Sequence, residues 1–199
     1  MTPEELGELI AIGYERRGIE FKGPGSLRDK AYAVKVVRAV LGMANRRDGG
    51  LVVLGVDERE GKLDATGVGE EEQGSWSFDL ISEFVAPYAD PSASFDLEHL
   101  EHEGKLFVVL RVHEFEDVPV LCAKSYEPTL RRGACYVRTR RKPETSEIPT
   151  QTEMRELIEL AVEKRLHEML GSLQRAGLSL ERPGPTDDER FDEQIGDLS

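Results

Sequence analysis

The sequence predicts an α/β fold of the α+β kind, in which a mixed β-sheet is flanked by helices and followed by a long C-terminal helix. Apolar residues recur every three or four positions across residues 28–46 and 154–173, which is the spacing of helices that pack on one side. Between residues 19 and 139, short apolar or alternating runs are separated by glycine, proline and charged turns, which indicates several strands. This order of elements is typical of a mixed sheet covered by helices.

The first half of the chain is expected to alternate helices with strands. A first helix should begin after Thr2, because Thr2 is a good N-cap, Pro3 fits the first helical position and Glu5 completes a capping box. Gly13 is expected to end this helix. The elements expected to follow are a strand at 19–22, a helix at 28–46 with a sharp glycine-containing turn, a strand at 51–56, a charged hairpin at 57–62 and a helix at 76–88.

The second half is expected to hold four strands and one long helix. The strands should lie at 95–103, 105–113, 118–123 and 134–139. Thr150 and Glu153 form a capping box for the helix, which carries an apolar stripe from Met154 to Leu173. From Gly177 the composition changes to proline, glycine and acids, which is typical of a disordered tail. We therefore expect a domain at 1–148, a C-terminal amphipathic helix at 149–176 and an acidic tail at 177–199.

Charge and composition narrow the class of protein. The net charge of −13 argues against a uniformly basic surface for DNA, although seven acids and only two arginines lie between residues 181 and 199. No apolar run approaches the roughly 18 residues of a transmembrane helix, and the N-terminus does not resemble a signal peptide. Cys122 and Cys135 have neither the spacing nor the histidines of a zinc site. We expect a cytoplasmic protein with no membrane partner.

Three carboxylates are candidates for a metal site. Glu20 lies on the polar face of its expected strand, and Asp57 ends the most apolar strand, where α/β sheets often present functional groups. A corner between helix and strand can bring Glu15 close to Glu20. Three converging carboxylates bind Mg²⁺ or Mn²⁺, which activate water during phosphate cleavage. Solvated surface acids are the alternative, and Lys22 either contacts phosphate or forms a simple ion pair with Glu20.

One segment is strongly basic against this acidic background. If residues 134–139 form a strand, Tyr136, Arg138 and Arg140 share one face, which combines an aromatic surface with guanidinium groups. Such a pairing suits phosphates and unstacked bases. The alternative is a charged strand edge that protects against aggregation. The basic residues of the segment are Arg131, Arg132, Arg138, Arg140, Arg141 and Lys142.

Three short motifs in the same order resemble the Schlafen AlbA-type domain family. Residues 15–22 read E-R-R-G-I-E-F-K and resemble its opening E-x-x-x-x-E-F-K motif. Residues 43–50 and 51–57, which end in G-V-D, resemble its A-N-x-x-G-G…G-V-D core. Residues 136–143 resemble its closing Y-x-R…S-T-R-x-A segment, although basic residues replace small polar ones there. The resemblance runs from about residue 15 to residue 147.

The resemblance implies a mixed α/β fold that binds nucleic acid, RNA in preference to DNA. In eukaryotic members with nuclease activity, a three-carboxylate site cleaves transfer and ribosomal RNA with a divalent cation, and its motif positions match Glu15, Glu20 and Asp57. Lys22, Arg138, Arg140 and Arg141 would then hold phosphates. The first hypothesis is therefore a metal-dependent endoribonuclease acting on structured RNA. The second is a non-catalytic, transcription-regulatory or binding module that forms a homodimer. The third is a protein-interaction module whose acidic tail mimics nucleic acid or covers the basic segment.

Overall fold

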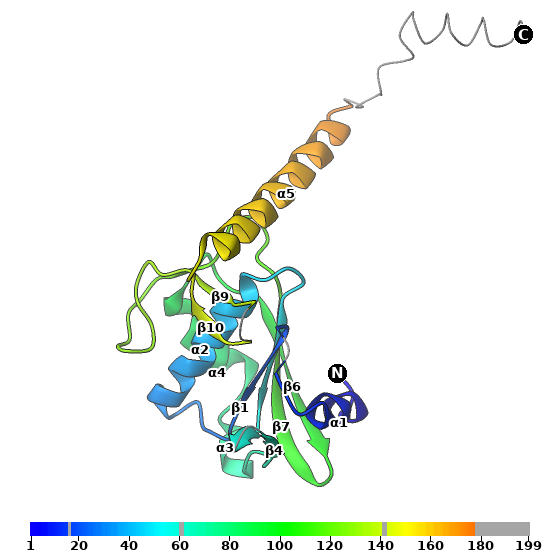
Figure 1. The fold of residues 1–199 in the computed structure, drawn as a ribbon, viewed down its shortest axis with the longest axis vertical. Helices are drawn as coiled ribbons and strands as arrows, with labels where there is room; N and C mark the ends of the chain where they lie inside the picture. The colour runs from blue at the N-terminus through cyan, green and yellow to red at the C-terminus, as the bar shows by residue number, and fades with distance from the viewer. Residues whose placement is uncertain (16, 60–61, 141–142, 178–199) are drawn as a thin grey trace, which may run out of the picture. The chain divides into compact units, whose positions relative to one another are not determined.

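The computed structural model describes residues 1–15, 17–59, 62–140 and 143–177 of the chain. The chain divides into two compact units, Met1–Val162 and Glu163–Ser199. The first unit contains every strand found among the described residues, together with helices α1 to α4 and the first turns of α5 (Gln151–Arg175) (Figure 1). The predicted acidic tail falls almost wholly on residues 178–199, which lie outside the described residues.

A four-stranded mixed sheet forms the centre of the first unit. Its strand order is β1-β2-β7-β6. Strand β1 (Ile19–Lys22) runs parallel to β2 (Gly50–Leu54), with Lys22 opposite Leu54. Strands β7 (Lys105–Val112) and β6 (Phe95–His102) continue the sheet in antiparallel pairs. The mixed sheet expected from the sequence is confirmed.

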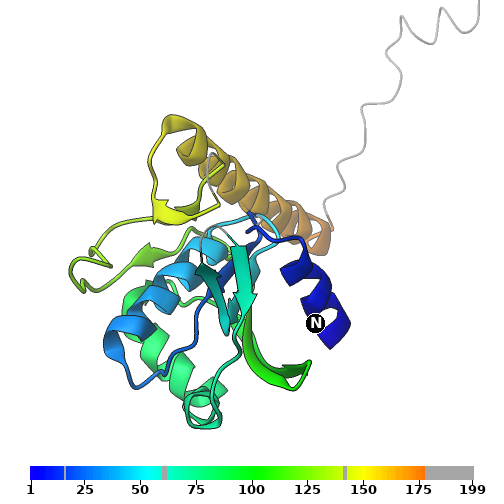
Figure 2. The same cartoon turned by 60° about the horizontal axis from the view of Figure 1, so that its bottom comes forward.

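Two hydrophobic cores lie on opposite faces of this sheet. Helices α2 (Lys30–Ala44) and α4 (Phe78–Val85) cover one face, and α1 (Pro3–Ala11) covers the other. Figures 1 and 2 show α2 and α1 on opposite sides of the strands. Strand β2 shows why the layers form, because Val52 and Leu54 belong to the α2 core while the alternate residue Val53 belongs to the α1 core.

Shorter strands complete the first unit. The pair β3 (Val56–Arg59) and β4 (Lys62–Ala65) contributes Val56 and Ala65 to the α1 core. Strands β9 (Tyr136–Arg138) and β10 (Thr145–Glu147) form an antiparallel pair against α2. Strand β10 packs closely against α2 at Gly42, where an added Cβ would lie 2.5 Å from Thr145 Cγ2. The remaining elements are α3 (Glu70–Gly74), the 3₁₀ turn η1 (Ala86–Tyr88) and the paired strands β5 (Ala89–Asp90) and β8 (Leu121–Cys122).

The helix ends follow the predicted capping residues. The Thr2 side chain accepts from Glu5 N at 3.2 Å, and the Glu5 carboxylate accepts from Thr2 N at 2.8 Å. At the start of α5, Glu153 N donates to the Thr150 hydroxyl at 3.5 Å, and that hydroxyl, in place of the backbone N, donates to the Glu153 carboxylate. The predicted helices at 2–13, at 28–46 and from 149 onward, and the predicted strands at 19–22, 95–103 and 105–113, are confirmed.

Four predicted elements are wrong in extent. The expected strand at 51–56 ends at Leu54, because Gly55 adopts φ +102° and turns the chain into β3. The expected helix at 76–88 begins only after Ser77, whose hydroxyl caps α4, while the Trp76 indole donates to Gly25 O at 2.9 Å and ties two loops together. The expected strands at 118–123 and 134–139 shrink to β8 and β9.

The turn between α2 and β2 is held by the side chain of Asn45, which is 6% exposed. Its Nδ2 donates to Val120 O at 2.8 Å and to Tyr136 O at 2.9 Å, while its Oδ1 accepts from Val120 N at 2.7 Å. Gly49 adopts φ +63°, which confirms the predicted need for glycine here. Asn45 therefore holds β9 and the backbone at Val120 against the C-terminal end of α2.

No helix in the described part of the chain is long and apolar enough to cross a membrane.

Candidate functional site

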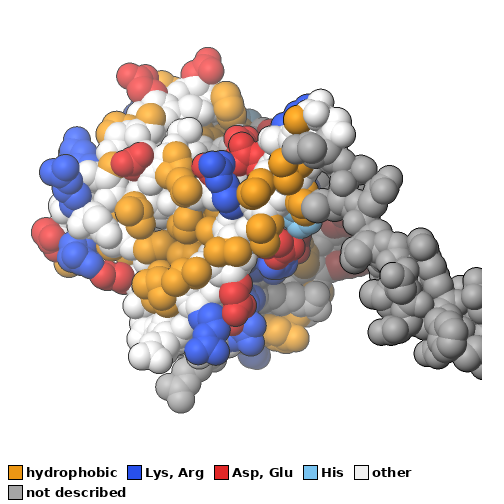
Figure 3. Space-filling view, turned by 90° about the horizontal axis from the view of Figure 1, so that it is seen from above, with side chains coloured by type: hydrophobic (Ala, Val, Ile, Leu, Met, Phe, Trp, Pro, Cys, Tyr) orange, Lys and Arg blue, Asp and Glu red, His pale blue; other side chains and the backbone are white. Residues whose placement is uncertain are grey.

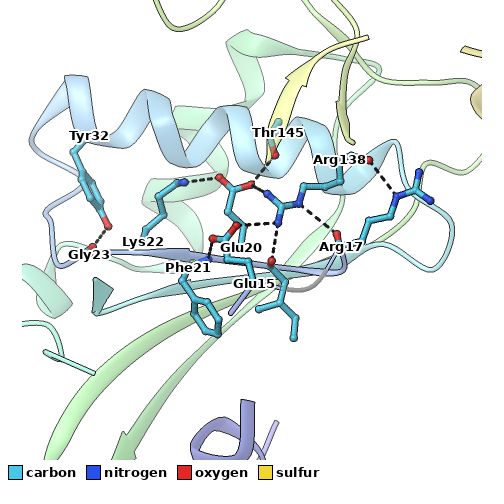
Figure 4. A network of polar contacts seen from close by, with 10 residues as sticks. Glu15, Arg17, Glu20, Phe21, Lys22, Gly23, Tyr32, Arg138 and Thr145 are labelled. Atoms are coloured by element: carbon cyan, nitrogen blue, oxygen red, sulfur yellow. Dashed lines mark hydrogen bonds and ion pairs between the residues drawn. The ribbon is translucent and has the colours of Figure 1, made fainter. Parts of the chain in front are cut away.

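Strand β1 sends its two polar side chains toward the α2 side of the sheet. Ile19 and Phe21 belong to the α1 core, so the alternate residues Glu20 and Lys22 point to the opposite face. There β9 and β10 cover Glu20, which is only 4% exposed (Figure 4). A buried carboxylate is costly unless it is paired, and its partners therefore define the site.

Arg138 of β9 is the main partner of this carboxylate. Its side chain is fully buried, and its Nη1 lies 2.9 Å from Glu20 Oε2. Its Nη2 lies 3.2 Å from Glu15 Oε2 and donates to Ile19 O at 2.8 Å, while its Nε donates to Arg17 O at 3.3 Å. One guanidinium thus joins the predicted carboxylates Glu15 and Glu20 and fixes the backbone of the corner between them.

Other donors complete the shell around the two carboxylates. Thr145 of β10 donates to Glu20 Oε2 at 2.6 Å, and the Lys22 ammonium donates to Glu20 Oε1. Phe21 N donates to Glu15 Oε1 at 2.7 Å. The predicted ion pair between Lys22 and Glu20 is therefore present, and both oxygens of each carboxylate have a hydrogen-bond donor (Figure 4).

The two carboxylates differ in their proton affinity. Burial raises the pKa of Glu15, and the hydrogen bond from Phe21 and the charge of Arg138 oppose it only in part. Burial also disfavours the charged form of Glu20, but the charges of Lys22 and Arg138 and the hydrogen bonds from Lys22 and Thr145 outweigh it and lower the pKa of Glu20. Glu20 is therefore the more strongly ionised member of the pair.

Asp57 lies at the sheet end where β1 and β2 terminate. Gly55 N donates to Lys22 O at 2.9 Å, which aligns the two strand ends. The Asp57 carboxylate packs against Gly23, where an added Cβ would lie 3.2 Å from Asp57 Oδ1, and the same oxygen accepts from Glu58 N at 3.1 Å. This matches the expectation that Asp57 stands beyond the carboxyl end of its strand.

The described residues contain no group of three or more His, Cys, Asp or Glu side chains arranged to hold a metal ion. Glu15 and Glu20 meet through Arg138, whereas Asp57 lies against Gly23. As arranged here, the three predicted ligands do not fit a three-carboxylate centre, because a guanidinium and an ammonium already neutralise Glu20. The site for Mg²⁺ or Mn²⁺ stays a prediction.

The predicted basic strand differs from its expected form. All three residues of β9 are buried, so Tyr136 and Arg138 are not on an exposed face of the strand. The Tyr136 ring is 5% exposed and packs in the α2 core, with its hydroxyl accepting from Arg131 N at 2.9 Å. Arg140 is exposed and pairs with Glu156, while Arg141 lies outside the described residues. Contacts of these residues with nucleic acid stay predictions.

A pocket of about 390 Å³ lies beside this centre, and no sequence pattern indicated it. Arginines from three segments line it: Arg17 before β1, Arg46 and Arg47 after α2, and Arg138 and Arg140 in and after β9. Burial and the charge of Arg17 lower the pKa of Arg46, because cations are crowded here. The acids that line the same pocket are Asp48, Glu153, Glu156 and Glu159.

Glu156 of α5 connects the pocket to the carboxylate centre. Its Oε2 accepts from Arg17 Nη2 at 2.8 Å, and its Oε1 pairs with Arg140. Arg17 in turn donates from Nε to Arg138 O at 3.2 Å. Only the run of basic residues was visible in the sequence, whereas their convergence depends on the packing of β9 and α5.

Replacing Arg138 by methionine should destabilise the fold by about 3–5 kcal/mol, because the buried Glu20 carboxylate loses a fully buried countercharge. Arg140→Met is the matched control, since Arg140 is exposed and its ion pair is worth about 0–1 kcal/mol. Urea denaturation measures both. Equal effects of the two substitutions would contradict the role assigned to Arg138.

The stability contributed by Glu20 should depend on pH. Since the folded protein lowers the pKa of Glu20 below its ordinary value of 4.5, its ion pairs stabilise the fold above that value and this contribution is lost as the pH falls through the lower, folded-state pKa. The wild type should therefore be more stable than Glu20→Gln near neutral pH, and the difference should vanish in acid. A difference independent of pH in denaturation experiments would exclude this.

Comparisons with known proteins found structural matches at low sequence identity. No curated protein matches the chain. A crystal structure of the DIP2311 protein from Corynebacterium diphtheriae is 14% identical with a TM-score of 0.49, covers 73% of this chain and is itself covered over only 26% of its length. The N-terminal domain of a protein related to the ATP-dependent DNA helicase RecG, from Nitrosomonas europaea, is 18% identical with a TM-score of 0.43, and the match covers 76% of this chain and 93% of that one.

The family model named Schlafen, AlbA_2 matches residues 15–147. This range begins at the Glu15 carboxylate and ends with β10, so it contains the whole Glu15–Glu20–Arg138 centre and stops before α5. The match covers well over half of the chain. The chain belongs to the Schlafen AlbA_2 family.

Proposed function

We propose that this chain binds nucleic acid, RNA in preference to DNA, through the arginine-lined pocket beside Glu15 and Glu20. The observation that carries the proposal is the convergence of Arg17, Arg46, Arg47 and Arg140 from separate segments on one pocket. Guanidinium groups bind phosphate oxygens in a bidentate manner and are common in nucleic-acid sites. Membership of the Schlafen AlbA_2 family supports the same proposal.

The acids of this pocket set the conditions under which binding occurs. Glu156 already pairs with Arg17 and Arg140, so a bound phosphate competes with an internal carboxylate. The net charge of −13 further reduces long-range attraction to a polyanion. Nucleic-acid binding should therefore depend on contacts within the pocket and weaken strongly as the salt concentration rises. It should also weaken when Arg46 and Arg47, the pocket arginines that form no ion pair with Glu156 among the described residues, are replaced.

The paired substitution Arg46→Gln and Arg47→Gln should weaken binding of labelled transfer RNA about tenfold or more and reduce the slope of log affinity against log salt by about 1–2, because each lost phosphate contact removes about 0.7–0.9 from that slope. Arg28→Gln with Arg132→Gln is the matched control, since both side chains are exposed and away from the pocket. Fluorescence anisotropy at several salt concentrations measures this. Equal losses in the two paired variants would contradict a specific pocket.

Cleavage of the bound RNA is the second step of the proposal. Glu15, Glu20 and Asp57 would hold Mg²⁺ or Mn²⁺, which supplies Lewis-acid and water-activating chemistry when bound. Support comes from the positions of these three acids in the family motifs. The Lys22 ammonium contacts Glu20 Oε1, so an ion there requires Lys22 to move away, and this side chain is the most exposed partner of Glu20.

Incubation of the full chain with transfer RNA and Mn²⁺ tests cleavage. Wild type should produce defined fragments, and Asp57→Asn should abolish them while leaving RNA binding intact, because Asp57 does not line the arginine pocket. Lys22→Met should increase the affinity for Mn²⁺ measured by calorimetry, since it removes the competing ammonium. Equal cleavage by wild type and Asp57→Asn, or none by either, removes the nuclease hypothesis.

A non-catalytic binding module is the alternative function. The observation that favours it is the neutralisation of Glu15 and Glu20 by Arg138 and Lys22, which gives both carboxylates a structural role. Salt-dependent RNA binding without Mn²⁺-dependent cleavage is the outcome that this alternative predicts.

A further inference from the structure

Glu156 of α5 places a carboxylate in the arginine-lined pocket, where a bound phosphate would carry its charge. Its Oε2 accepts from Arg17 Nη2 at 2.8 Å, and its Oε1 pairs with Arg140 Nε. Oε1 is buried, yet none of the described residues forms a hydrogen bond with it. Two guanidinium groups from separate segments thus hold one carboxylate, and one of its oxygens is attracted by charge alone. Glu156 therefore fills this position incompletely.

Arg46 brings a further cation to the same pocket. Its guanidinium packs against Gly18, where an added Cβ would lie 3.3 Å from Arg46 Cζ. Its Nη1 donates to the backbone carbonyls of Arg47 and Gly49. Within the described part of the chain, Arg46 forms no ion pair with a carboxylate. Its charge is therefore placed for an anion that Glu156 does not supply.

The size of the pocket favours the end of a nucleic-acid strand. Pockets for small ligands span roughly 300–1,000 Å³. A volume of about 390 Å³ therefore accommodates one terminal nucleotide but not a long stretch of backbone. Binding along a strand uses a continuous positively charged groove. On the face seen in Figure 3, Lys and Arg side chains instead form small separate groups, divided by hydrophobic and acidic side chains.

Charge distinguishes the two kinds of phosphate that a nucleic acid offers. A phosphodiester within the strand carries one negative charge, as the Glu156 carboxylate does, so exchanging one for the other gains little. A phosphate monoester at a chain end carries about −1.5 to −2 charges at pH 7 and has three strong acceptor oxygens. It replaces both contacts of Glu156 and retains charge and an acceptor oxygen for Arg46.

We infer that the pocket binds the terminal phosphate monoester of an RNA strand, which displaces the Glu156 carboxylate from Arg17 and Arg140. This inference rests on the proposed RNA binding and names the chemical group that the pocket recognises. Glu156 belongs to α5, which begins at Gln151, whereas the family match ends at residue 147. The competing carboxylate therefore comes from outside the matched region.

Short oligoribonucleotides of one sequence test the recognised group. They carry a 5′-phosphate, a 3′-phosphate or hydroxyls at both ends, with the same fluorescent label on an internal base. Fluorescence anisotropy with the full chain should show that one phosphate-ended strand binds about tenfold or more tightly than the hydroxyl-ended strand, because it adds charge-assisted hydrogen bonds. The strand that gains identifies the end. Arg46→Gln should reduce this preference.

Replacing Glu156 tests the displacement. Glu156→Gln keeps the side-chain shape but removes the competing charge, so it should tighten binding of the preferred strand about tenfold. Glu159→Gln is the matched control, because Glu159 lines the same pocket from the same helix but is exposed and forms no ion pair with the pocket arginines among the described residues. It should change that affinity less than about threefold. Thermal unfolding of both variants checks that they remain folded.

Equal binding of all three strands overturns the inference, and so do equal effects of the two glutamine variants. The earlier paired variant, Arg46→Gln with Arg47→Gln, separates this failure from failure of the proposed function. If that variant weakens binding of transfer RNA while the strand ends make no difference, RNA binding stands and only the recognition of a terminal phosphate is lost. No binding of any RNA by the wild type removes both.

Discussion

The ion pair between Arg138 and Glu20 is the constraint on which the rest of the site depends. The two residues are 118 positions apart, and both side chains are almost inaccessible to water. Charges buried in this way are tolerated only with good geometry and with further hydrogen bonds. Here Thr145 and Lys22 satisfy the carboxylate, while two backbone carbonyls and Glu15 satisfy the guanidinium.

The Arg138–Glu20 ion pair connects β1 with β9, which belong to different sheets. Strand β1 ends the central sheet, and β9 with β10 forms a separate two-stranded sheet. Arg138 and Thr145 join them through Glu20, and Gly42 lets β10 approach α2 closely enough for those contacts. Arg17 and Glu156 extend the network to the first turns of α5. The carboxylates, the arginine pocket and the start of α5 therefore form one connected polar system.

Ligands of this polar system must compete with the ion pairs inside it. Glu20 is ionised but already neutralised, so any cation or phosphate that enters the site must compete with an internal partner. Such competition favours ligands with several charges over single ions. A single ion would replace one internal ion pair by one new ion pair, with little net gain in free energy. A polyanion can engage the pocket arginines together, which suits nucleic acid better than a small anion.

Sequence periodicity determined most of the secondary structure and the identity of the charged residues. Helical spacing, capping boxes and strand alternation are local properties, so α1, α2, β1, β6, β7 and the start of α5 follow from them. The motif that contains Glu15, Glu20 and Lys22 could likewise be recognised without a structure. Alternation correctly placed Glu20 and Lys22 on the same face.

Tertiary structure decided what covers each face. Alternation predicted that Tyr136 and Arg138 share one face of a strand, but only the packing shows that every residue of β9 is buried, and no local pattern reveals that. The bend at Gly55 sets the position of Asp57, and the partnership of Arg138 with Glu20 depends on a contact across most of the chain. Periodicity also marked the stripe of α5, yet only the fold shows that Leu157 and Leu160 are buried while Ile158 and Val162 remain exposed, because a repeating pattern specifies a face and not its partner.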